Sequence, residues 1–169
     1  DGYFKTSSIG AVAVSESDPN IIYVGMGEHA PRAVMTSYGD GVYKSTDAGK
    51  TWKNIGLKNT QHISRVVIHP KNPNIVFVAA QGALYGPNNE RGIFKSVDGG
   101  VSWNKVLYVN NLTGCSELSM DFNNPLVMYA AMWEHQRLPW KVISGGLGSG
   151  LYKTTDGGIT WNQIHEGLP

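Results

Sequence analysis

The chain has 169 residues, of which 41% are hydrophobic and 16% are charged, and its formal net charge is +1. This composition suits one soluble globular domain. The small net charge argues against nucleic-acid binding driven by charge. No apolar run is long enough to span a membrane. The single cysteine, Cys115, excludes an internal disulfide, and we expect it to be a small buried residue. No signal peptide is visible, and the abrupt start at Asp1-Gly2 is typical of a processed or excised segment.

A proline turn followed by a β-rich run recurs three times along the chain, at residues 17–25, 71–79 and 123–131. The prolines Pro19, Pro73 and Pro125 lie 54 and 52 residues apart. Proline presets φ and asparagine tolerates left-handed geometry, so each copy predicts a turn that leads into a strand.

A second pattern follows the first in each third of the chain, at residues 41–52, 92–103 and 150–161. It consists of a short β-run, a polar turn of the form Ser/Thr-x-Asp-x-Gly-x-Ser/Thr, and a tryptophan. The two patterns keep one register, which indicates duplication of a whole unit. The repeated positions are Ser45, Asp47, Gly49 and Trp52, then Ser96, Asp98, Gly100 and Trp103, then Thr154, Asp156, Gly158 and Trp161.

Each unit predicts four strands, which in the second unit cover residues 63–68, 75–80, 92–96 and 104–108. Nothing shows a helical period longer than a turn or two. A period near 50 residues with four strands in each unit predicts an all-β fold, a β-propeller segment of about three four-stranded blades. We expect one domain over residues 1–169, with blades at about residues 7–57, 61–110 and 114–166.

The three polar turns resemble Asp-boxes, the signature of bacterial neuraminidase (BNR) repeats. The whole chain is similar to the bacterial Asp-box propellers labelled sortilin-like or glycosyl hydrolase, including residues 24–28 and 90–92. The resemblance implies a larger ring of about six to eight blades in a longer protein that is secreted, periplasmic or on the cell surface. Because sialidases and sortilin-type receptors both use such blades, the resemblance implies no single function.

Three blades do not close a ring, and terminal repeats of such arrays need covering. We therefore expect further blades of a parent chain, or a second subunit, to cover the open faces. Tyr3-Phe4 is expected to be the outer strand of a preceding blade, and residues 167–169 lead toward a following one.

The repeated aspartates are expected to be structural. Asp and Ser/Thr side chains bond nearby backbone N–H groups in a turn, glycine permits positive φ, and the tryptophan packs the hairpin against its blade. Substitution of Asp98 by Ala should then lower stability and leave ligand affinity unchanged.

Propeller geometry places the short turns after strands one and three on one face and the connections after strands two and four on the other. The connections after strand two are long, at residues 27–40, 81–91 and 133–149. Long loops confined to one face of a repeat array mark a binding face, and Gln61-His62 and Asn110-Asn111 border it. The candidate ligand-binding residues in these loops are Glu28, His29, Arg32, Tyr85, Arg91, Trp133, Glu134, His135, Arg137 and Trp140, accompanied by Tyr38 and Asp40.

These residue types allow two interpretations. Aromatic rings can stack on sugars or grip a peptide, and arginines can pair with carboxylates. Alternatively, Arg and Glu brace the loops by bonding carbonyls and each other, the interpretation favoured for Glu90-Arg91. For Trp133 and Trp140, packing and ligand contact stay equally open.

The favoured function is a non-catalytic module that binds a protein, peptide or glycan, or serves as a scaffold. The alternative is a glycoside hydrolase, sialidase-like or of another Asp-box type, completed by blades outside this chain. Such enzymes need two carboxyl groups roughly 5–9.5 Å apart. Glu28 and Glu134 are the candidates, with Asp40 third, but they belong to units whose backbones should lie about 20 Å apart.

Sialidases carry an Arg-Ile-Pro-type motif before their first Asp-box. Here the similar Arg137-Leu138-Pro139 comes late in the chain and inside a loop, so we do not assign it that role. A metal site built from Glu28-His29 and Glu134-His135 lacks short ligand spacing, so we expect no metal and no cofactor.

Overall fold

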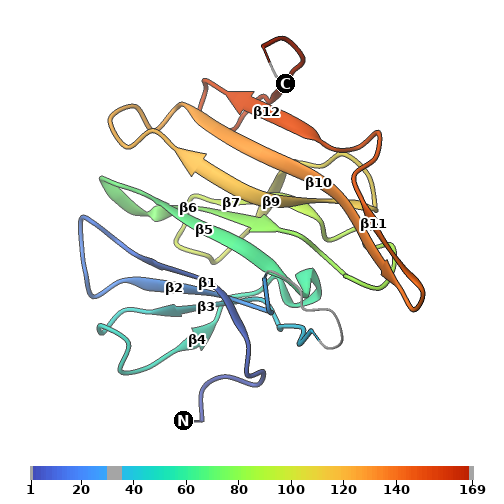
Figure 1. Ribbon diagram of the computed structural model, residues 1–169. Coiled ribbons are helices and arrows are strands. Elements are labelled where there is room, and N and C mark those ends of the chain that lie inside the picture. The colour runs from blue at the N-terminus through green and yellow to red at the C-terminus, as the bar shows by residue number, and fades with distance from the viewer. Residues whose placement is uncertain (1, 30–35, 168–169) are drawn as a thin grey trace.

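The computed structural model describes residues 2–29 and 36–167, and it consists of three antiparallel sheets that stack as successive blades. Figure 1 shows them in chain order, from the N-terminal blade at the bottom to the C-terminal blade at the top. The first blade is formed by β1 (Ile9–Val14), β2 (Ile22–Met26), β3 (Val42–Ser45) and β4 (Lys53–Asn54), in that order across the sheet.

The second blade follows the short 3₁₀ turn η1 (Lys58–Thr60), which is the only helical element in the part of the chain that the structure describes. Its strands are β5 (Ile63–His69), β6 (Asn72–Ala80), β7 (Gly92–Ser96) and β8 (Asn104–Leu107), again in chain order. This agrees with the four strands predicted from the sequence, and it confirms the all-β propeller architecture. Pro73 lies inside β6 rather than in the preceding turn, because His69 already pairs with Asn72.

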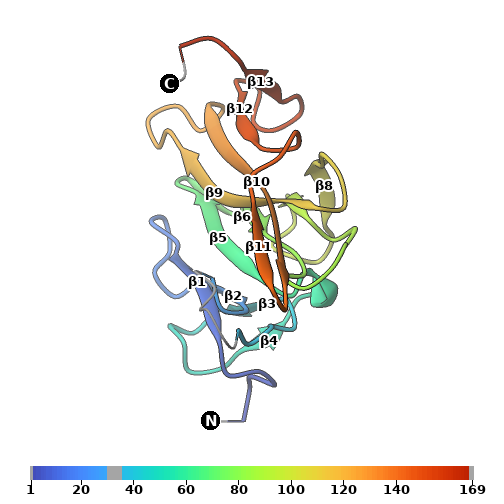
Figure 2. The ribbon, with the colours of Figure 1, turned by 45° about the vertical axis from the view of Figure 1, so that its right-hand side comes forward.

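The third blade repeats the plan with one addition. Its four strands are β9 (Thr113–Met120), β10 (Met128–Leu138), β12 (Gly150–Thr154) and β13 (Asn162–Ile164). The first part of β10 pairs with β9 and β12, and its far part continues as a hairpin with β11 (Lys141–Ser144). The hairpin projects from the blade in Figures 1 and 2.

This hairpin corrects the expectation of an irregular loop over residues 133–149. Four residue pairs, from His135↔Ser144 to Leu138↔Lys141, continue the ladder beyond the blade. The run Lys141–Ser144 includes the β-branched residues Val142 and Ile143, which favour strands, and Pro139 lies in the connecting turn. The irregular part is therefore confined to the glycine-rich return before β12.

Two apolar cores hold the blades together, one at each blade-to-blade interface. Tyr23 and Val42 of blade one meet Val66, Val78 and other residues of blade two. Phe77 and Ile93 of blade two meet Cys115, Met128 and Met132 of blade three. Burial between sheets, rather than within one sheet, is what stabilises a repeat array of this kind.

The three Asp-box turns share one hydrogen-bond pattern. In the second, Ser96 Oγ donates to Asp98 at 2.7 Å, and the N–H and hydroxyl of Ser102 donate to the same carboxylate at 2.9 and 2.6 Å. Gly100 N–H donates to Ser96 Oγ at 2.8 Å. The first and third turns repeat these contacts, so each aspartate is held inside its own turn.

The three tryptophans differ. Trp52 Nε1 donates to Gly49 of its own turn, and Trp103 Nε1 donates to the Ile55 carbonyl of the preceding blade. Trp161 Nε1 is buried without a partner among the described residues. None of the helical segments described is long and apolar enough to cross a membrane.

Candidate functional site

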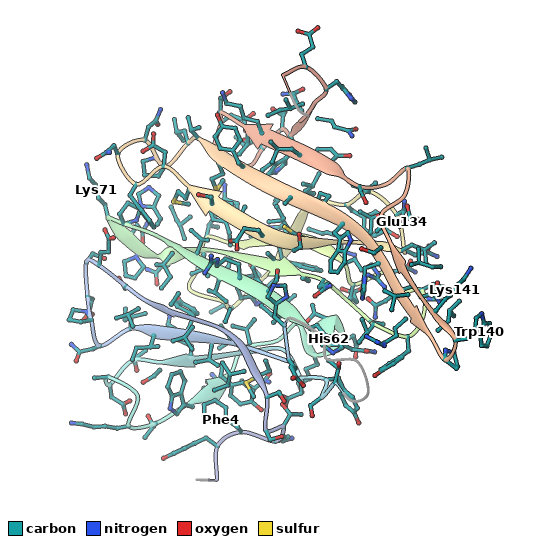
Figure 3. All side chains as sticks on the ribbon, viewed as in Figure 1. Phe4, His62, Lys71, Glu134, Trp140 and Lys141 are labelled. Carbon is teal, nitrogen blue, oxygen red and sulfur yellow. The ribbon has the colours of Figure 1, made fainter. Side chains whose placement is uncertain are left out.

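The long connections and the short turns lie at opposite ends of the strands. Figure 3 shows Lys71, in the turn between β5 and β6, at one end, and Glu134, Trp140 and Lys141 at the other. We call the end that carries residues 27–29, 36–40, 81–91 and 133–149 the loop face. Every sequence-predicted site residue that the structure describes belongs to it, whereas Arg32 lies outside the described residues.

Arg91 organises the second loop of this face. The residue is 1% exposed, and its guanidinium donates to the carbonyls of Gln81 at 2.6 Å, of Gly86 at 3.1 Å, and of Ala83. Burial lowers the pKa of Arg91 to about 10, so the side chain stays charged at neutral pH. These contacts are those of a loop brace, and they keep the guanidinium away from solvent.

The same loop is also held by the connections on either side of blade two and by the hairpin of blade three. Asn88 Nδ2 donates to the Asn59 carbonyl at 3.2 Å, and Asn88 N–H donates to the Asn111 carbonyl at 2.9 Å. Arg137 N–H, in the hairpin of blade three, donates to the Leu84 carbonyl at 2.9 Å. The loop face is therefore one connected layer across the three blades.

A group of buried polar side chains lies under this layer, around Gln81. His29 Nδ1 lies 3.2 Å from Gln81 Oε1, which links the first loop to the second. His62 Nδ1 lies 2.9 Å from the Gly82 carbonyl. Because a carbonyl only accepts, His62 carries its proton on Nδ1, and Nε2 presents a lone pair.

Several polar atoms of this group have no hydrogen-bond partner among the described residues. Besides Trp161 Nε1, these atoms come from the loop face and from the starts of β5 and β9 next to it: Thr36 Oγ1, His62 Nε2, Gln81 Nε2, Arg91 Nε, Thr113 Oγ1, and both ring nitrogens of His135.

Two histidines of the group are held neutral. Burial lowers the pKa of His62, and the nearby Arg91 and His29 lower it further. Burial also lowers the pKa of His135, with Arg91 and Arg137 acting in the same direction and the backbone of Ile143 opposing them. The loop face therefore offers uncharged imidazoles beside buried cationic groups at neutral pH.

A pocket opens on this face between two exposed tyrosines. Tyr38 comes from the first loop and Tyr85 from the second, and their side chains are 67% and 56% exposed. The pocket has a volume of about 570 Å³ and is otherwise lined by hydroxyl and ammonium groups, those of Lys5, Thr6, Ser7, Thr36 and Ser37. Two aromatic side chains together with hydrogen-bonding groups suit a polar ligand with apolar ring faces.

The three candidate carboxylates are all engaged in local contacts. Asp40 accepts from the Tyr43 hydroxyl at 2.7 Å and from Thr6 at 3.3 Å, which fixes the end of the first loop. Glu28 accepts from Ser37 N–H at 3.3 Å. Glu134 accepts from Gly148 N–H at 3.0 Å, and a Cβ on Gly146 would lie 2.4 Å from its carboxyl carbon. Glu134 thus folds the glycine-rich return against β10.

The aromatic residues of the hairpin occupy different surroundings. Trp133 packs against His135 with ring centroids 4.0 Å apart, whereas Trp140 is 77% exposed at the tip of the hairpin. Trp133 is thus partly covered by a neighbouring ring, whereas Trp140 is open to solvent. Arg137 lies on the same hairpin, and its charge reaches His135. Within residues 2–29 and 36–167, no group of three or more His, Cys, Asp or Glu side chains could hold a metal ion.

A second concave surface, which the sequence reading missed, lies along the first strands of the blades. A groove of about 430 Å³ is lined by residues of β1, β5 and β9, including Val66 and Met120. Arg65 and Glu117 cross it as a bidentate pair with distances of 2.6 and 3.0 Å. The sequence offered one signal for this contact: Arg65 in Ile63-Ser-Arg65 and Glu117 in Cys115-Ser-Glu117 carry opposite charges at equivalent repeat positions.

The architecture and its turns define the class of protein: a segment of an Asp-box β-propeller with a loop face built from the connections after the second strands. The chain belongs to the Sortilin-Vps10 family (sortilin, neurotensin receptor 3), whose model matches residues 40–168.

Similar proteins are enzymes of much greater length. A xyloglucanase of Acetivibrio thermocellus is 24% identical over 91% of this chain, and a xyloglucanase of a Paenibacillus species is 22% identical over 95%. The chain spans 19% and 16% of these two relatives. The xyloglucanase activity is that of those proteins, of which this chain matches about one fifth.

Solved structures show the same fold. An ancestral GH74 enzyme superimposes with a TM-score of 0.67 at 22% identity, over 96% of this chain and 21% of that one. The GH74 xyloglucanase from Xanthomonas campestris gives 0.61 at 16% identity, over 94% and 22%. YCF48 from Cyanidioschyzon merolae gives 0.51 at 17% identity, over 95% and 37%.

Proposed function

We propose that the loop face binds a glycan chain, and that the three blades serve as a non-catalytic binding segment of a larger propeller. The observation that carries this proposal is the pocket between Tyr38 and Tyr85. Sugar rings have apolar faces that stack on aromatic side chains and hydroxyl edges that need hydrogen-bond partners. The pocket offers both.

The buried layer below supports a ligand-binding role. The brace from Arg91 and the contacts of Asn88 fix Tyr85 on a rigid support, which reduces the entropy lost on binding. Trp140, at the tip of the hairpin, extends the aromatic surface beyond the pocket.

Binding is tested by calorimetric titration with soluble xyloglucan, since two relatives are named for this polymer. Substitution of Tyr85 or Tyr38 by Ala should weaken binding about tenfold or more, as for loss of one stacking contact of about 1.5 kcal/mol. The matched control is Phe122→Ala, an exposed aromatic residue in the turn between β9 and β10 on the opposite face. Equal binding by all three variants would overturn the assignment of this pocket.

A second candidate function is glycoside hydrolysis by a site that other blades complete. The names of the curated relatives favour it. Glu28 and Glu134 are its candidates here, although Glu134 already bonds Gly148 and the two carboxylates belong to blades one and three. A hydrolase needs one carboxyl group as acid and a second as nucleophile or base, so a partner carboxylate would come from another blade.

Hydrolysis is tested by release of reducing sugar from xyloglucan by a protein that contains this chain with its neighbouring blades. Loss of activity in Glu28→Gln at an unchanged melting temperature would support a catalytic carboxylate in this segment. Full activity of both Glu28→Gln and Glu134→Gln would place the catalytic pair outside it. Xyloglucan binding without hydrolysis would leave the non-catalytic proposal standing.

Our proposal extends to the cellular setting and the classification of the turns. Because two relatives are named for xyloglucan, a polymer that a bacterial cell meets outside itself, we assign the protein to a secreted, periplasmic or surface location. We also assign the three turns to the bacterial neuraminidase repeat type, on the Ser/Thr, Asp, Gly and Trp positions that all three share.

A further inference from the structure

One histidine of the loop face is buried without the hydrogen bonds that usually accompany burial. His135, in the far part of β10, is 3% exposed, and neither of its ring nitrogens has a partner among the described residues. Its ring stacks on that of Trp133, with centroids 4.0 Å apart. An uncharged ring leaves one N–H donor unpaired in this position. A charged ring would leave two unpaired donors and a buried charge, which costs far more.

The charged side chains that act on this ring are both cations. Arg91 and Arg137 oppose a charge on His135, and only the backbone of Ile143 in β11 favours it. Arg91 is held in place by the carbonyls of its own loop, so it cannot turn away into solvent. The carboxylate of Glu134, the preceding residue, is turned toward the glycine-rich return instead. The surroundings of His135 therefore suit a neutral imidazole.

His135 lies in the part of the hairpin that is docked on the second loop. The hairpin of β10 and β11 runs from blade three past the loop-face end of blade two (Figures 1 and 2). His135 N–H donates to the Leu112 carbonyl at 3.3 Å, and Arg137 N–H donates to the Leu84 carbonyl of the second loop at 2.9 Å. Leu84 immediately precedes Tyr85, so this second bond supports the backbone beside the pocket.

We propose that His135 is a pH-sensitive switch: when its ring takes up a proton, the hairpin of β10 and β11 leaves the second loop. In the docked hairpin the second N–H donor has no acceptor and two cations act on the charge. In the undocked hairpin water solvates both donors and the charge. Undocking would break the bond from Arg137 to Leu84 and remove a support beside Tyr85. The inference concerns the hairpin itself, so it does not depend on glycan binding.

The direction of the effect follows from the weaker hold of the docked state on the proton. Burial lowers the pKa of His135 below its ordinary value of 6.5, and Arg91 and Arg137 act in the same direction. The solvated ring of the undocked hairpin keeps the ordinary pKa, so the undocked state binds the proton first as the pH falls. Docking is therefore fully stable above pH 6.5 and is weakened by about tenfold at pH 5.5, one unit below that value.

The other buried histidine of the layer is not expected to respond to undocking. His62 Nδ1 donates to the Gly82 carbonyl at 2.9 Å, and the charged groups that act on the ring are Arg91, Glu28 and His29. None of these residues belongs to the hairpin. His62 should therefore take up its proton when blade two unfolds, whereas His135 should take it up when the hairpin alone leaves.

The switch is tested by amide hydrogen exchange read by NMR, with each rate corrected for the intrinsic exchange rate at its pH. The reporter is the Arg137 amide, and the amides of β6 report unfolding of blade two. Between pH 7.5 and pH 5.5 we expect the protection of the Arg137 amide to fall about tenfold. In His135→Phe, which keeps a ring on Trp133 but does not titrate, this fall should be absent. The matched control His165→Gln, in the exposed C-terminal segment, should keep it.

Three results would overturn the proposal. One is an equal fall in protection in the unsubstituted chain and in His135→Phe. Another is a protection of the Arg137 amide that stays constant between the two pH values. The third is a protection of the Arg137 amide equal to that of β6 at both pH values, since the hairpin would then leave only when the blade unfolds. His135→Gln provides the same comparison with a polar side chain if His135→Phe does not fold.

Discussion

At the scale of single residues, the Asp-box aspartates are held ionised by their turns. Hydrogen bonds from Thr51 and then Ser45 lower the pKa of Asp47 to about 2, and the corresponding donors place the pKa of Asp98 and Asp156 well below the usual range. Since the folded state favours the carboxylate, the unfolded state binds protons first when the pH falls. The stabilisation is complete above about pH 4 and is lost between about pH 4 and pH 2.

We predict that Asp98→Asn lowers the melting temperature at pH 7 and reduces the fall in melting temperature between pH 4 and pH 2. An amide cannot accept the bonds from Ser96 and Ser102 as a carboxylate does. Thermal unfolding followed by circular dichroism measures both effects. Xyloglucan affinity should not change, and a large affinity loss at an unchanged melting temperature would contradict the structural role.

The buried histidine His62 makes stability depend on pH in the same direction as the aspartates do, but at milder pH. Burial lowers its pKa below the ordinary value of 6.5, so the unfolded state takes up the proton first. Its contribution is present above about pH 6.5 and is lost as the pH falls below that value.

We predict that His62→Asn loses less stability than the unsubstituted chain between pH 7.5 and pH 5.5. The Asn amide can still donate to the Gly82 carbonyl, but it does not titrate. Urea denaturation at a series of pH values measures the difference, with His165→Asn in the exposed C-terminal segment as the control. Identical slopes for His62→Asn and the unsubstituted chain would show that His62 contributes nothing to the pH dependence.

At the scale of elements, the second loop depends on one side chain. Replacing Arg91 by Met leaves the carbonyls of Gln81, Ala83 and Gly86 without their donor. We expect a loss of about 2–4 kcal/mol, since each buried hydrogen bond contributes about 1 kcal/mol and an unpaired group costs more. The loop that carries Tyr85 should loosen, and hydrogen exchange of residues 81–91 should rise above that of β6. Retained stability and protection would show that the brace is dispensable.

The strand pattern could be predicted closely from the sequence, because turn chemistry and repeat register both act locally. Proline turns and Asp-boxes mark the strand ends, so strands such as β7 were predicted to the residue. The hairpin of β10 and β11 was missed because it has no counterpart in the other two units, so the repeat pattern assigned residues 133–149 to a loop. Its four residue pairs are local, and Val142 and Ile143 were the available strand signal. The bond from Arg137 N–H to the Leu84 carbonyl, which holds the hairpin against blade two, is a long-range contact with no local signal.

The sequence predicted which face of the molecule carries the candidate site, but not what each of its residues contacts. Repeat position places Glu28, Tyr85 and Glu134 at the same ends of equivalent strands, which is enough to define the face. The sequence does not indicate that Gln81 links His29 to the buried layer, or that Glu134 folds a glycine-rich return. These roles depend on which blades are neighbours and on the depth at which each side chain lies.

At the scale of the whole molecule, packing at the interfaces between blades holds the three blades together. Phe77, at 1% exposure, is packed between blades two and three, whereas Tyr129, its counterpart on blade three, is 39% exposed. We predict that Phe77→Ala costs about 3–5 kcal/mol and that Tyr129→Ala costs much less. Chemical denaturation of both variants tests this, and equal losses would show that burial between blades two and three contributes nothing extra.

The burial of Cys115 has a practical consequence for this array. The thiol is fully buried at the interface of blades two and three, its Sγ donates to the Glu117 carbonyl, and burial raises its pKa. As it is the only thiol in the chain, a thiol-labelling reagent can react only when these two blades separate. The rate of thiol modification in native buffer therefore reports how often blades two and three separate. We expect it to be slow in the intact chain and markedly faster in Phe77→Ala, and a rate equal to that of a free peptide thiol would mean that the two blades do not stay closed.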